Sequence, residues 1–331
     1  MRCGIGPIPD DLKDRPRLSP SAIEKFLESP AHYLAYKQKE FKETDAMLEG
    51  TLIHMAALEP DKFFSEYAAI PIKEQFPKCL FTMDDIKNEL DAMKVEYKKS
   101  LKKAELVALI KQHRPEIQIW EEVVEAMCAG KIQVKNETFT ACVRIAEKIK
   151  ARKFESKIWD QGIKETYIWF EHHSGVIISM KPDFYALGLG EKKINLCLDI
   201  KKVQAVDRRS IQYEMTDSQN VMKAAIYNDG LSAIHNGLIF NMFCFLFVTA
   251  KPPYSIKNVA VNEGQLDAGR ELYEKAIEAW LVCYENNYWP DEAEEVVNYE
   301  EPDYFFTSVE NKINNLDYFV ENTKRKFENG K

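Results

Sequence analysis

Three carboxylates and a lysine in the middle of the chain have the types and order that suit metal-dependent chemistry: Glu165, Asp183, Asp199 and Lys201. Carboxylates hold hard divalent cations such as Mg²⁺, which stabilise charge developing on a phosphodiester and make a bound water more acidic. A neighbouring lysine can orient that water and help to deprotonate it. These residues therefore predict phosphodiester hydrolysis. Asp183 and Asp199 would be the main metal ligands, Glu165 would complete the site, and Lys201 would act on the water.

The segments around these residues have patterns that would bring their side chains together. Three runs of β-branched and aromatic residues predict strands, with a polar, glycine-containing turn between the first two: 167–170, 176–180 and 194–200. Alternate residues of a strand share a face, so Asp199 and Lys201 should project into the same space. Asp183 follows Pro182 at the end of the preceding strand and can reach the same point. The pattern predicts one compact site.

Each motif also has an ordinary structural explanation. Taken alone, an Asp-x-Lys triplet such as Asp199-Ile200-Lys201 is most often a surface ion pair, and a Pro-Asp pair such as Pro182-Asp183 is no more specific. The order favours chemistry, because a hairpin is followed by an apolar strand that ends at the second carboxylate.

In this order the motifs resemble the signature of the PD-(D/E)XK nuclease superfamily. The whole chain is similar, more specifically, to phage and prophage exonucleases of the RecE (exonuclease VIII) type. Other segments carry the same resemblance in the same order: 18–21, 27–33, 49–54, 58–63, 224–230, 252–254, 269–270 and 289–290. The resemblance implies an α/β, restriction-endonuclease-like core with a mixed central sheet flanked by helices.

The resemblance also implies further metal ligands. His54 matches the histidine of a Gly-Thr-x-x-His helix, and the backbone of Ile200 lies within the Asp-x-Lys motif. A histidine on an apolar helix is otherwise more often a satisfied core residue.

Residues implied to contact DNA include two departures from the family pattern. Lys181 stands where the family has arginine, and a lysine cannot reproduce bidentate guanidinium geometry. Lys223 replaces a glutamine, for which Gln219, one turn earlier on the same helical face, can substitute. Tyr227 follows on that face as a phosphate contact, with a half-buried packing role as its alternative.

Residues 80–115 are predicted to form a helical insertion with two short amphipathic helices. The pair resembles the SAP or HeH class of helix–extended–helix DNA-binding modules, although the usual glycine of the connecting turn is absent. The resemblance implies that Lys102 and Lys103 grip DNA. A plain helical hairpin explains the pattern equally well.

Other segments define the expected organisation. We expect an extended arm over residues 1–17, a nuclease domain over 18–295 that contains the insertion, and a tail over 296–331 that packs on another subunit or frays. Residues 203–213 are expected to form a loop. The remaining main elements are predicted as helices at 22–30, 46–58, 119–130, 137–153, 215–228 and 266–287 and a strand at 238–249.

Composition sets the outer bounds. Seven scattered cysteines and the lack of a leader segment predict free thiols in a reducing, cytoplasmic setting. The longest apolar run, 237–250, is too short to cross a bilayer, so no membrane partner is expected. A net charge of −8 disfavours DNA on average, so any DNA path must be a local basic strip.

The expected activity is a Mg²⁺-dependent exodeoxyribonuclease, with Mn²⁺ able to substitute, acting on the ends of linear double-stranded DNA. The resemblance implies 5′-to-3′ polarity, phage-type homologous recombination, a homo-oligomeric ring and a single-strand annealing partner. Two alternatives remain: a structure-specific endonuclease with the same metal site, and a non-catalytic DNA-binding protein on the same fold.

Overall fold

A computed structural model describes residues 2–38, 44–216, 218–291 and 313–314. Contacts divide the chain into two units, Met1–Trp289 and Pro290–Lys331. The fold below is that of the first unit. The predicted tail lies outside the described residues except for positions 313–314.

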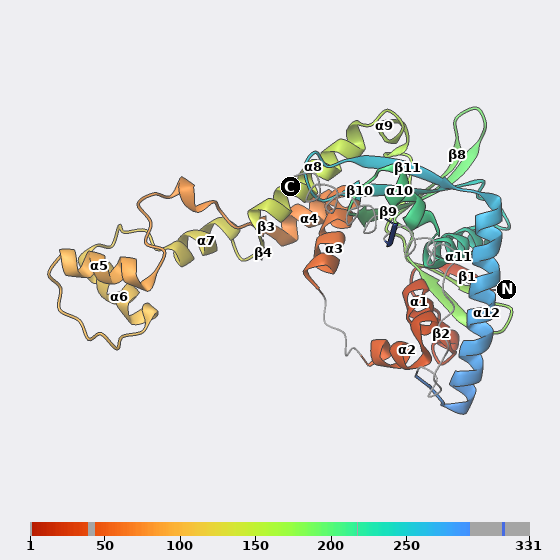
Figure 1. The fold of residues 1–331 in the computed structure, drawn as a ribbon, viewed down its shortest axis with the longest axis horizontal. Coiled ribbons are helices and arrows are strands. Elements are labelled where there is room, and N and C mark those ends of the chain that lie inside the picture. Colours follow the sequence, from red (N-terminus) through yellow and green to blue (C-terminus); the bar gives the residue numbers. More distant parts are fainter. Residues whose placement is uncertain (1, 39–43, 217, 292–312, 315–331) are drawn as a thin grey trace, which may run out of the picture. The chain divides into compact units, whose positions relative to one another are not determined.

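The first unit contains a five-stranded sheet that carries the Asp-x-Lys motif. Its strand order is β11-β10-β9-β8-β5. The strands are β5 (Ile163–Lys164), β8 (Phe184–Leu189), β9 (Ile194–Val203), β10 (Met242–Thr249) and β11 (Ile256–Val261). β9 and β10 run parallel, whereas the other neighbours are antiparallel. The predicted mixed sheet is therefore confirmed (Figure 1).

A four-stranded sheet, ordered β1-β6-β7-β2, contains the predicted hairpin. Its strands are β1 (Cys3–Ile5), β2 (Arg17–Leu18), β6 (Ile168–Glu171) and β7 (Ile177–Met180). The hairpin prediction is confirmed. Part of the expected extended arm over residues 1–17 joins this sheet, because β1 pairs with β6 and β2 pairs with β7. The arm also contains the short 3-10 helix η1 (Asp10–Leu12).

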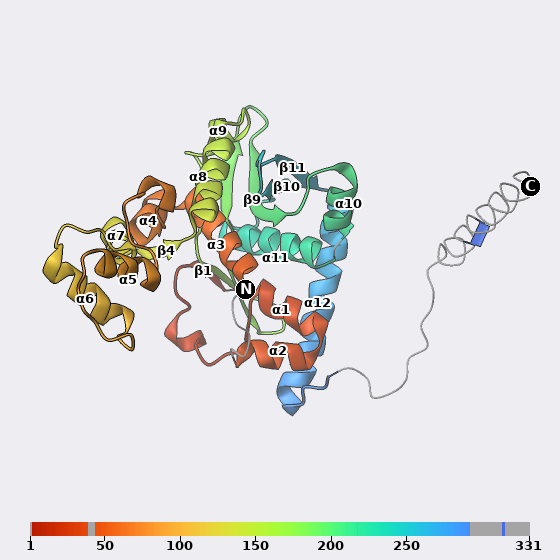
Figure 2. The same cartoon turned by 60° about the vertical axis from the view of Figure 1, so that its left-hand side comes forward.

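Helices cover the sheets in two groups. α3 (Asp45–Leu58) and α8 (Asn136–Ala151) pack side by side and share a core with β8, β9 and β10. α1 (Pro20–Glu28), α11 (Ser218–Ile234) and α12 (Glu263–Asn286) share the other main core with the hairpin. Figure 2 shows α3 and α11 on either side of β9. The remaining helices of this part are α2 (Pro30–Lys37), α4 (Pro60–Glu66), α9 (Glu155–Ile158) and α10 (Arg208–Thr216).

The predicted loop over residues 203–213 is wrong, since α10 occupies most of it. Asp207 immediately precedes this helix, and its side chain accepts hydrogen bonds from the backbone N–H groups of Arg209, at 2.9 Å, and Ser210, at 3.2 Å. This is the chemistry of an N-terminal cap. The polar composition obscured the helix because much of it faces solvent.

The predicted helical insertion has a small core of its own. α5 (Met83–Ala92) and α6 (Lys103–His113) pack through Ile86, Leu90, Leu106 and Ile110, all fully buried. The segments around this pair are β3 (Tyr67–Ala69), η2 (Lys73–Gln75), α7 (Trp120–Cys128) and β4 (Ile132–Val134). Within the described residues, no helix is long and apolar enough to cross a membrane.

Candidate active site

His54 is carried into the site by α3, whose N-terminal half is held by two side-chain contacts. Thr44 caps the helix by accepting a hydrogen bond from Met47 N–H at 3.2 Å. Lys202 of β9 pairs with Glu49, with Nζ 2.9 Å from Oε2. These contacts hold His54 Nδ1 3.2 Å from Asp183 Oδ1.

Asp183 lies between β7 and β8 and is buried. Its Oδ2 accepts a hydrogen bond from Ile200 N–H at 2.6 Å, and its backbone carbonyl accepts one from Glu165 N–H at 3.1 Å. The Asp-x-Lys strand and Glu165 therefore both bond to Asp183, the first to its carboxylate and the second to its backbone. The observed contact of Ile200 is made by its amide N–H.

Glu165 adopts a left-handed backbone conformation with φ 50°. A residue with a side chain rarely adopts this conformation, at a cost of roughly 1–3 kcal/mol, and such residues cluster at functional sites. Here the turn places the Glu165 carboxylate in an ion pair with Lys181.

His54, Glu165 and Asp183 form the nucleus of a cation site. One ligand atom from each lies within 4.8 Å of the other two. All three line a cavity of about 400 Å³, together with Thr51, Lys62 and Lys181 among others. One imidazole and two carboxylates form a donor set that suits a divalent cation.

The charges within this nucleus are strongly linked. Although burial lowers the pKa of His54, the adjacent Asp183 carboxylate raises it to about 9. Burial alone would raise the pKa of Asp183, but His54 holds it below its usual range. Burial raises the pKa of Glu165, and Lys181 only partly opposes that effect. Without a cation, the imidazolium therefore acts as the counter-charge for Asp183.

Asp199 faces α11, where Lys223 provides its counter-charge. Lys223 Nζ lies 2.8 Å from Asp199 Oδ1. Burial raises the pKa of Asp199 despite this cation, and the carboxylate in turn holds the pKa of Lys223 well above its usual range. Asp199 is almost fully buried, and a carboxylate is a ligand type that hard divalent cations prefer.

Lys201 projects toward the same helix as Asp199, as the strand alternation predicts. Its ammonium donates a hydrogen bond to Asn220 Oδ1 and lies 4.0 Å from Glu214 Oε2. Asn220 is itself held by a hydrogen bond from its Nδ2 to the Glu214 carbonyl at 2.8 Å. Lys201 is thus fixed beside Asp199, and its action on a water remains a prediction.

The predicted DNA-contact residues have different placements. Lys181 lines the cavity, whereas Lys223 is paired within the site. Gln219 lies one turn before Lys223 on α11. The structure does not place Tyr227 on a DNA-facing surface: its ring is buried and its hydroxyl donates to the Lys181 carbonyl at 3.3 Å. This matches the packing alternative, because an apolar core surrounds this face of α11.

Asn220, Glu24 and the pairing of Lys223 with Asp199 were missed from sequence. Asn220 and Lys223 are three residues apart in the predicted helix, so their common face could have been recognised as the partner of Asp199 and Lys201. Glu24 of α1 had no such signal. It is partly buried and its pKa is raised by burial, while the charges of Lys223 and Lys201 oppose that shift.

The insertion's lysines are only partly available to a ligand. Lys103 Nζ lies 2.5 Å from Glu121 Oε1 and donates to the Phe81 carbonyl at 2.9 Å. Lys102 is exposed. Two further cations in this segment pair with local carboxylates, Lys111 with Glu122 and Arg114 with Glu89. DNA binding by the insertion therefore remains a prediction centred on Lys102.

Comparison with known proteins places this architecture in a family. Residues 19–302 match the family model described as "PDDEXK-like domain of unknown function (DUF3799)". A structure from Eubacterium rectale, described as a "Putative exonuclease", is similar at 13% identity and a TM-score of 0.48, covering 92% of this chain and 99% of that one. The structure of SSO0001 is similar at 16% identity and a TM-score of 0.24, covering 38% of this chain and 55% of that one.

No curated protein matches the chain. The family model spans most of the sequence and includes every residue of the candidate site. The chain therefore belongs to the PDDEXK-like family, as the Pro182-Asp183 and Asp199-Ile200-Lys201 motifs predict, and so to the PD-(D/E)XK class of nucleases.

Proposed function

We propose that this protein is a Mg²⁺-dependent exodeoxyribonuclease that hydrolyses linear double-stranded DNA from its ends. The observation that carries the proposal is the convergence of His54, Glu165 and Asp183 within 4.8 Å on an open cavity. Asp199 supplies a further buried carboxylate at this site. The similarity to RecE-type exonucleases supports the choice of substrate and of end-dependent cleavage.

The residues fit a divalent cation in number and chemistry. Asp183, Asp199, Glu165 and His54 would hold it, with Mn²⁺ able to substitute for Mg²⁺. When bound, it would supply Lewis-acid stabilisation of the phosphate oxygens and acidify a coordinated water.

The chain's own groups perform the remaining tasks. Lys201, held by Asn220, is placed beside Asp199 to orient the attacking water and take up negative charge. Lys223 offsets the charge of Asp199, so that the buried carboxylates can lie close together before a cation is bound. The hydrogen bond from Ile200 N–H keeps the Asp183 carboxylate in a fixed orientation.

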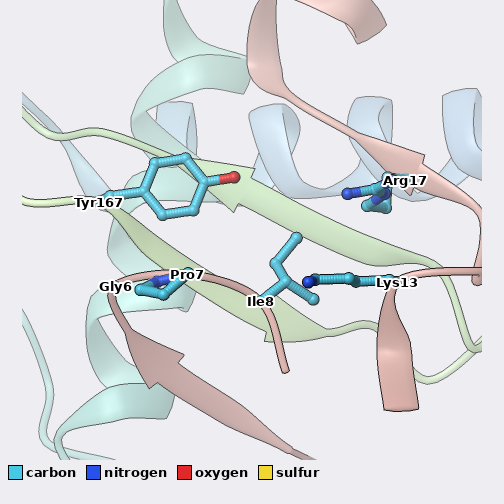
Figure 3. Close-up of a pocket in the computed structure, with 6 residues that line it drawn as sticks. All are labelled: Gly6, Pro7, Ile8, Lys13, Arg17 and Tyr167. Atoms are coloured by element: carbon cyan, nitrogen blue, oxygen red, sulfur yellow. The ribbon is translucent and has the colours of Figure 1, made fainter. Parts of the chain in front are cut away.

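Basic residues line two cavities, and both favour a substrate with negative charge. Lys62 and Lys181 line the cavity of the candidate site. Tyr167, two residues after Glu165 in the sequence, lines a separate cavity of about 540 Å³ together with Lys13 and Arg17. Figure 3 shows the Tyr167 hydroxyl pointing toward the Arg17 side of this cavity. Cations and a phenolic hydroxyl are groups that contact DNA phosphates, so an overall acidic chain still offers local strips for the backbone.

A comparison of DNA forms tests the proposal. Linear, nicked circular and covalently closed circular duplexes of the same sequence are incubated with Mg²⁺ or with EDTA. We expect nucleotide release from linear DNA with Mg²⁺ and none from the closed circle. Cutting of the closed circle would show the endonuclease alternative. Binding of linear DNA without cleavage under Mg²⁺ or Mn²⁺ would show the non-catalytic alternative.

The wider biological role extends this proposal. In phage-type recombination, the enzyme would degrade the 5′-ended strand as a homo-oligomeric ring and pass the 3′ tail to a single-strand annealing protein. Selective release of a 5′ label, compared with a 3′ label, tests the polarity. Sedimentation of the full chain with and without DNA tests the ring.

A further inference from the structure

Two histidines and a glutamate lie close together beyond the C-terminal end of β6, whereas Glu165 precedes its N-terminal end. His172 Nε2 lies 2.8 Å from Glu274 Oε2, and His173 Nε2 lies 3.3 Å from the same oxygen. One ligand atom from each residue lies within 4.8 Å of the others. We propose that His172, His173 and Glu274 form a second cation site, selective for Zn²⁺ or a similar transition-metal ion.

The spacing of these atoms is close to what such an ion requires. Zinc takes nitrogen and oxygen ligands at roughly 2.0–2.2 Å in a tetrahedron, so neighbouring ligand atoms lie roughly 3.3–3.6 Å apart. The separation of 3.3 Å lies within this range. The separation of 2.8 Å is shorter, and a small rotation of the Glu274 side chain would lengthen it.

The backbone already holds these ligands in place. In the turn between β6 and β7, His172 N–H donates to Val176 O at 2.8 Å and Gly175 N–H donates to His172 O at 2.9 Å. Gly175 has φ 85°, which glycine adopts without strain. On α12, the buried neighbours Tyr273 and Ile277 fix the face that presents Glu274.

An outer partner fixes the ring of His172, which is 5% exposed. Its Nδ1 lies 2.8 Å from Ser174 Oγ. Nδ1 also accepts a hydrogen bond from Ser174 N–H at 3.3 Å, so the ring proton lies on Nε2, which faces Glu274. Cation binding at Nε2 would move the proton to Nδ1, which would then donate to the Ser174 hydroxyl, and metal-binding histidines generally have such a second hydrogen bond. His173 is 69% exposed in its side chain, so its Nε2 can join without a burial cost.

The donor set distinguishes this site from the carboxylate-rich one. Two imidazoles and one carboxylate favour zinc and its neighbours over Mg²⁺, which prefers oxygen ligands. A cavity of about 540 Å³ adjoins the three residues and leaves room for solvent to complete the coordination. Arg270 also lines it, but its charge is taken up by Asp229 at 2.7 Å. A bound ion would link the hairpin turn to α12, which are 102 residues apart in sequence.

Zinc binding to the full chain, in a large excess of Mg²⁺, tests the site without using nuclease activity. Isothermal titration and native mass spectrometry are applied to wild type, Glu274→Gln and His173→Ala. Glu278→Gln is the matched control, because Glu278 lies one turn further along the same helix and pairs with Lys275 on the surface. His54→Gln removes a ligand of the other site.

We expect one zinc ion per chain in wild type, Glu278→Gln and His54→Gln. Affinity should fall in Glu274→Gln and His173→Ala by at least roughly 100-fold, the upper end of the loss seen when an outer-shell partner is removed. Zinc should also raise the melting temperature of wild type, but not that of Glu274→Gln. Equal affinity in wild type and His173→Ala, or zinc binding lost only in His54→Gln, would overturn the proposal. Because His173 is exposed, His173→Ala should keep its fold, so the test stays valid even if Glu274→Gln folds poorly.

Discussion

Asp199 links the proposed catalysis to stability, because the carboxylate proposed to bind a cation is also the partner of a largely buried lysine. The two effects can be separated by substitution. Asp199→Asn should lower cleavage by at least about 1,000-fold, because it removes charge stabilisation of several kcal/mol and each 1.36 kcal/mol is tenfold in rate.

The same substitution leaves the Lys223 ammonium without its counter-charge. We expect a loss of about 1–3 kcal/mol in the free energy of unfolding, less than for a fully buried pair because the Lys223 side chain is 27% exposed. Adding Lys223→Met should restore stability and leave cleavage absent. Urea unfolding and single-turnover cleavage measure the two effects. Wild-type cleavage by Asp199→Asn would exclude this carboxylate from the site.

The raised pKa of His54 predicts how the free energy of unfolding depends on pH when no metal is bound. Its pKa is raised from 6.5 to about 9 in the folded chain. The folded state therefore binds the extra proton between these values, and this contribution is complete below pH 6.5 and is lost as the pH rises through 9. The loss is on the order of 3 kcal/mol, shared with Asp183. In EDTA, wild type should lose more stability than His54→Gln between pH 6.5 and 9.5. Parallel curves for the two proteins would contradict this linkage.

At the residue scale, the sequence predicts which chemical groups are present better than it predicts their partners. Asp183, Asp199 and Lys201 could be recognised because strand alternation and motif order constrain them. The pairing of Asp199 with Lys223 depends on how α11 crosses β9, which is a tertiary property. Glu24 lies far from the motifs in sequence and has no local pattern of its own.

At the element scale, α11 and α12 pack closely because Gly269 has no side chain. A Cβ at this position would lie 2.3 Å from the Val221 carbonyl oxygen. Gly269→Ala should therefore cost about 1–3 kcal/mol of unfolding free energy through overpacking. Gly264→Ala, on the same helix, is the matched control: its nearest neighbour would be 3.5 Å away, so its effect should be neutral or stabilising. Equal denaturation midpoints for both variants would show that the helices can separate at no cost.

The insertion offers a second element-scale test. Lys98, Lys99 and Lys102 are exposed, whereas Lys103 is held by Glu121. If the insertion binds DNA, changing the three exposed lysines to glutamine should weaken binding and reduce the slope of log affinity against log salt by about 0.9 per lost phosphate contact. Lys275→Gln on α12 is the control for a general change in charge. An unchanged slope would identify the segment as a plain helical hairpin.

Elements with a strong apolar pattern were predictable, whereas those with mixed patterns were missed. β10 and the hairpin are confirmed because their side chains are buried in long apolar runs. β8 was missed because its sequence continues into a glycine-rich turn, and β11 because it lies at a partly exposed sheet edge. Sheet order depends on long-range pairing, which a single sequence does not specify.

At the scale of the whole molecule, the acidic composition places a condition on function. A chain with net charge −8 repels DNA unless local basic strips, together with a cation held at the proposed site, compensate. DNA binding should therefore depend steeply on both salt and divalent cation. The family assignment covers the PDDEXK-like domain, whereas metal dependence and cleavage from DNA ends belong to the proposal.

The most direct test is a time course on end-labelled linear duplex DNA with Mg²⁺, comparing wild type with Lys201→Ala. Lys201 is partly exposed and its partners are polar, so the variant should keep its fold, as circular dichroism would verify. The account predicts progressive Mg²⁺-dependent release of nucleotides from the ends by wild type. It predicts at least a 100-fold slower rate for the variant, within the 10²–10⁴ range of general acid–base catalysis. Equal rates for the two proteins, or no release by wild type, would contradict the central claim.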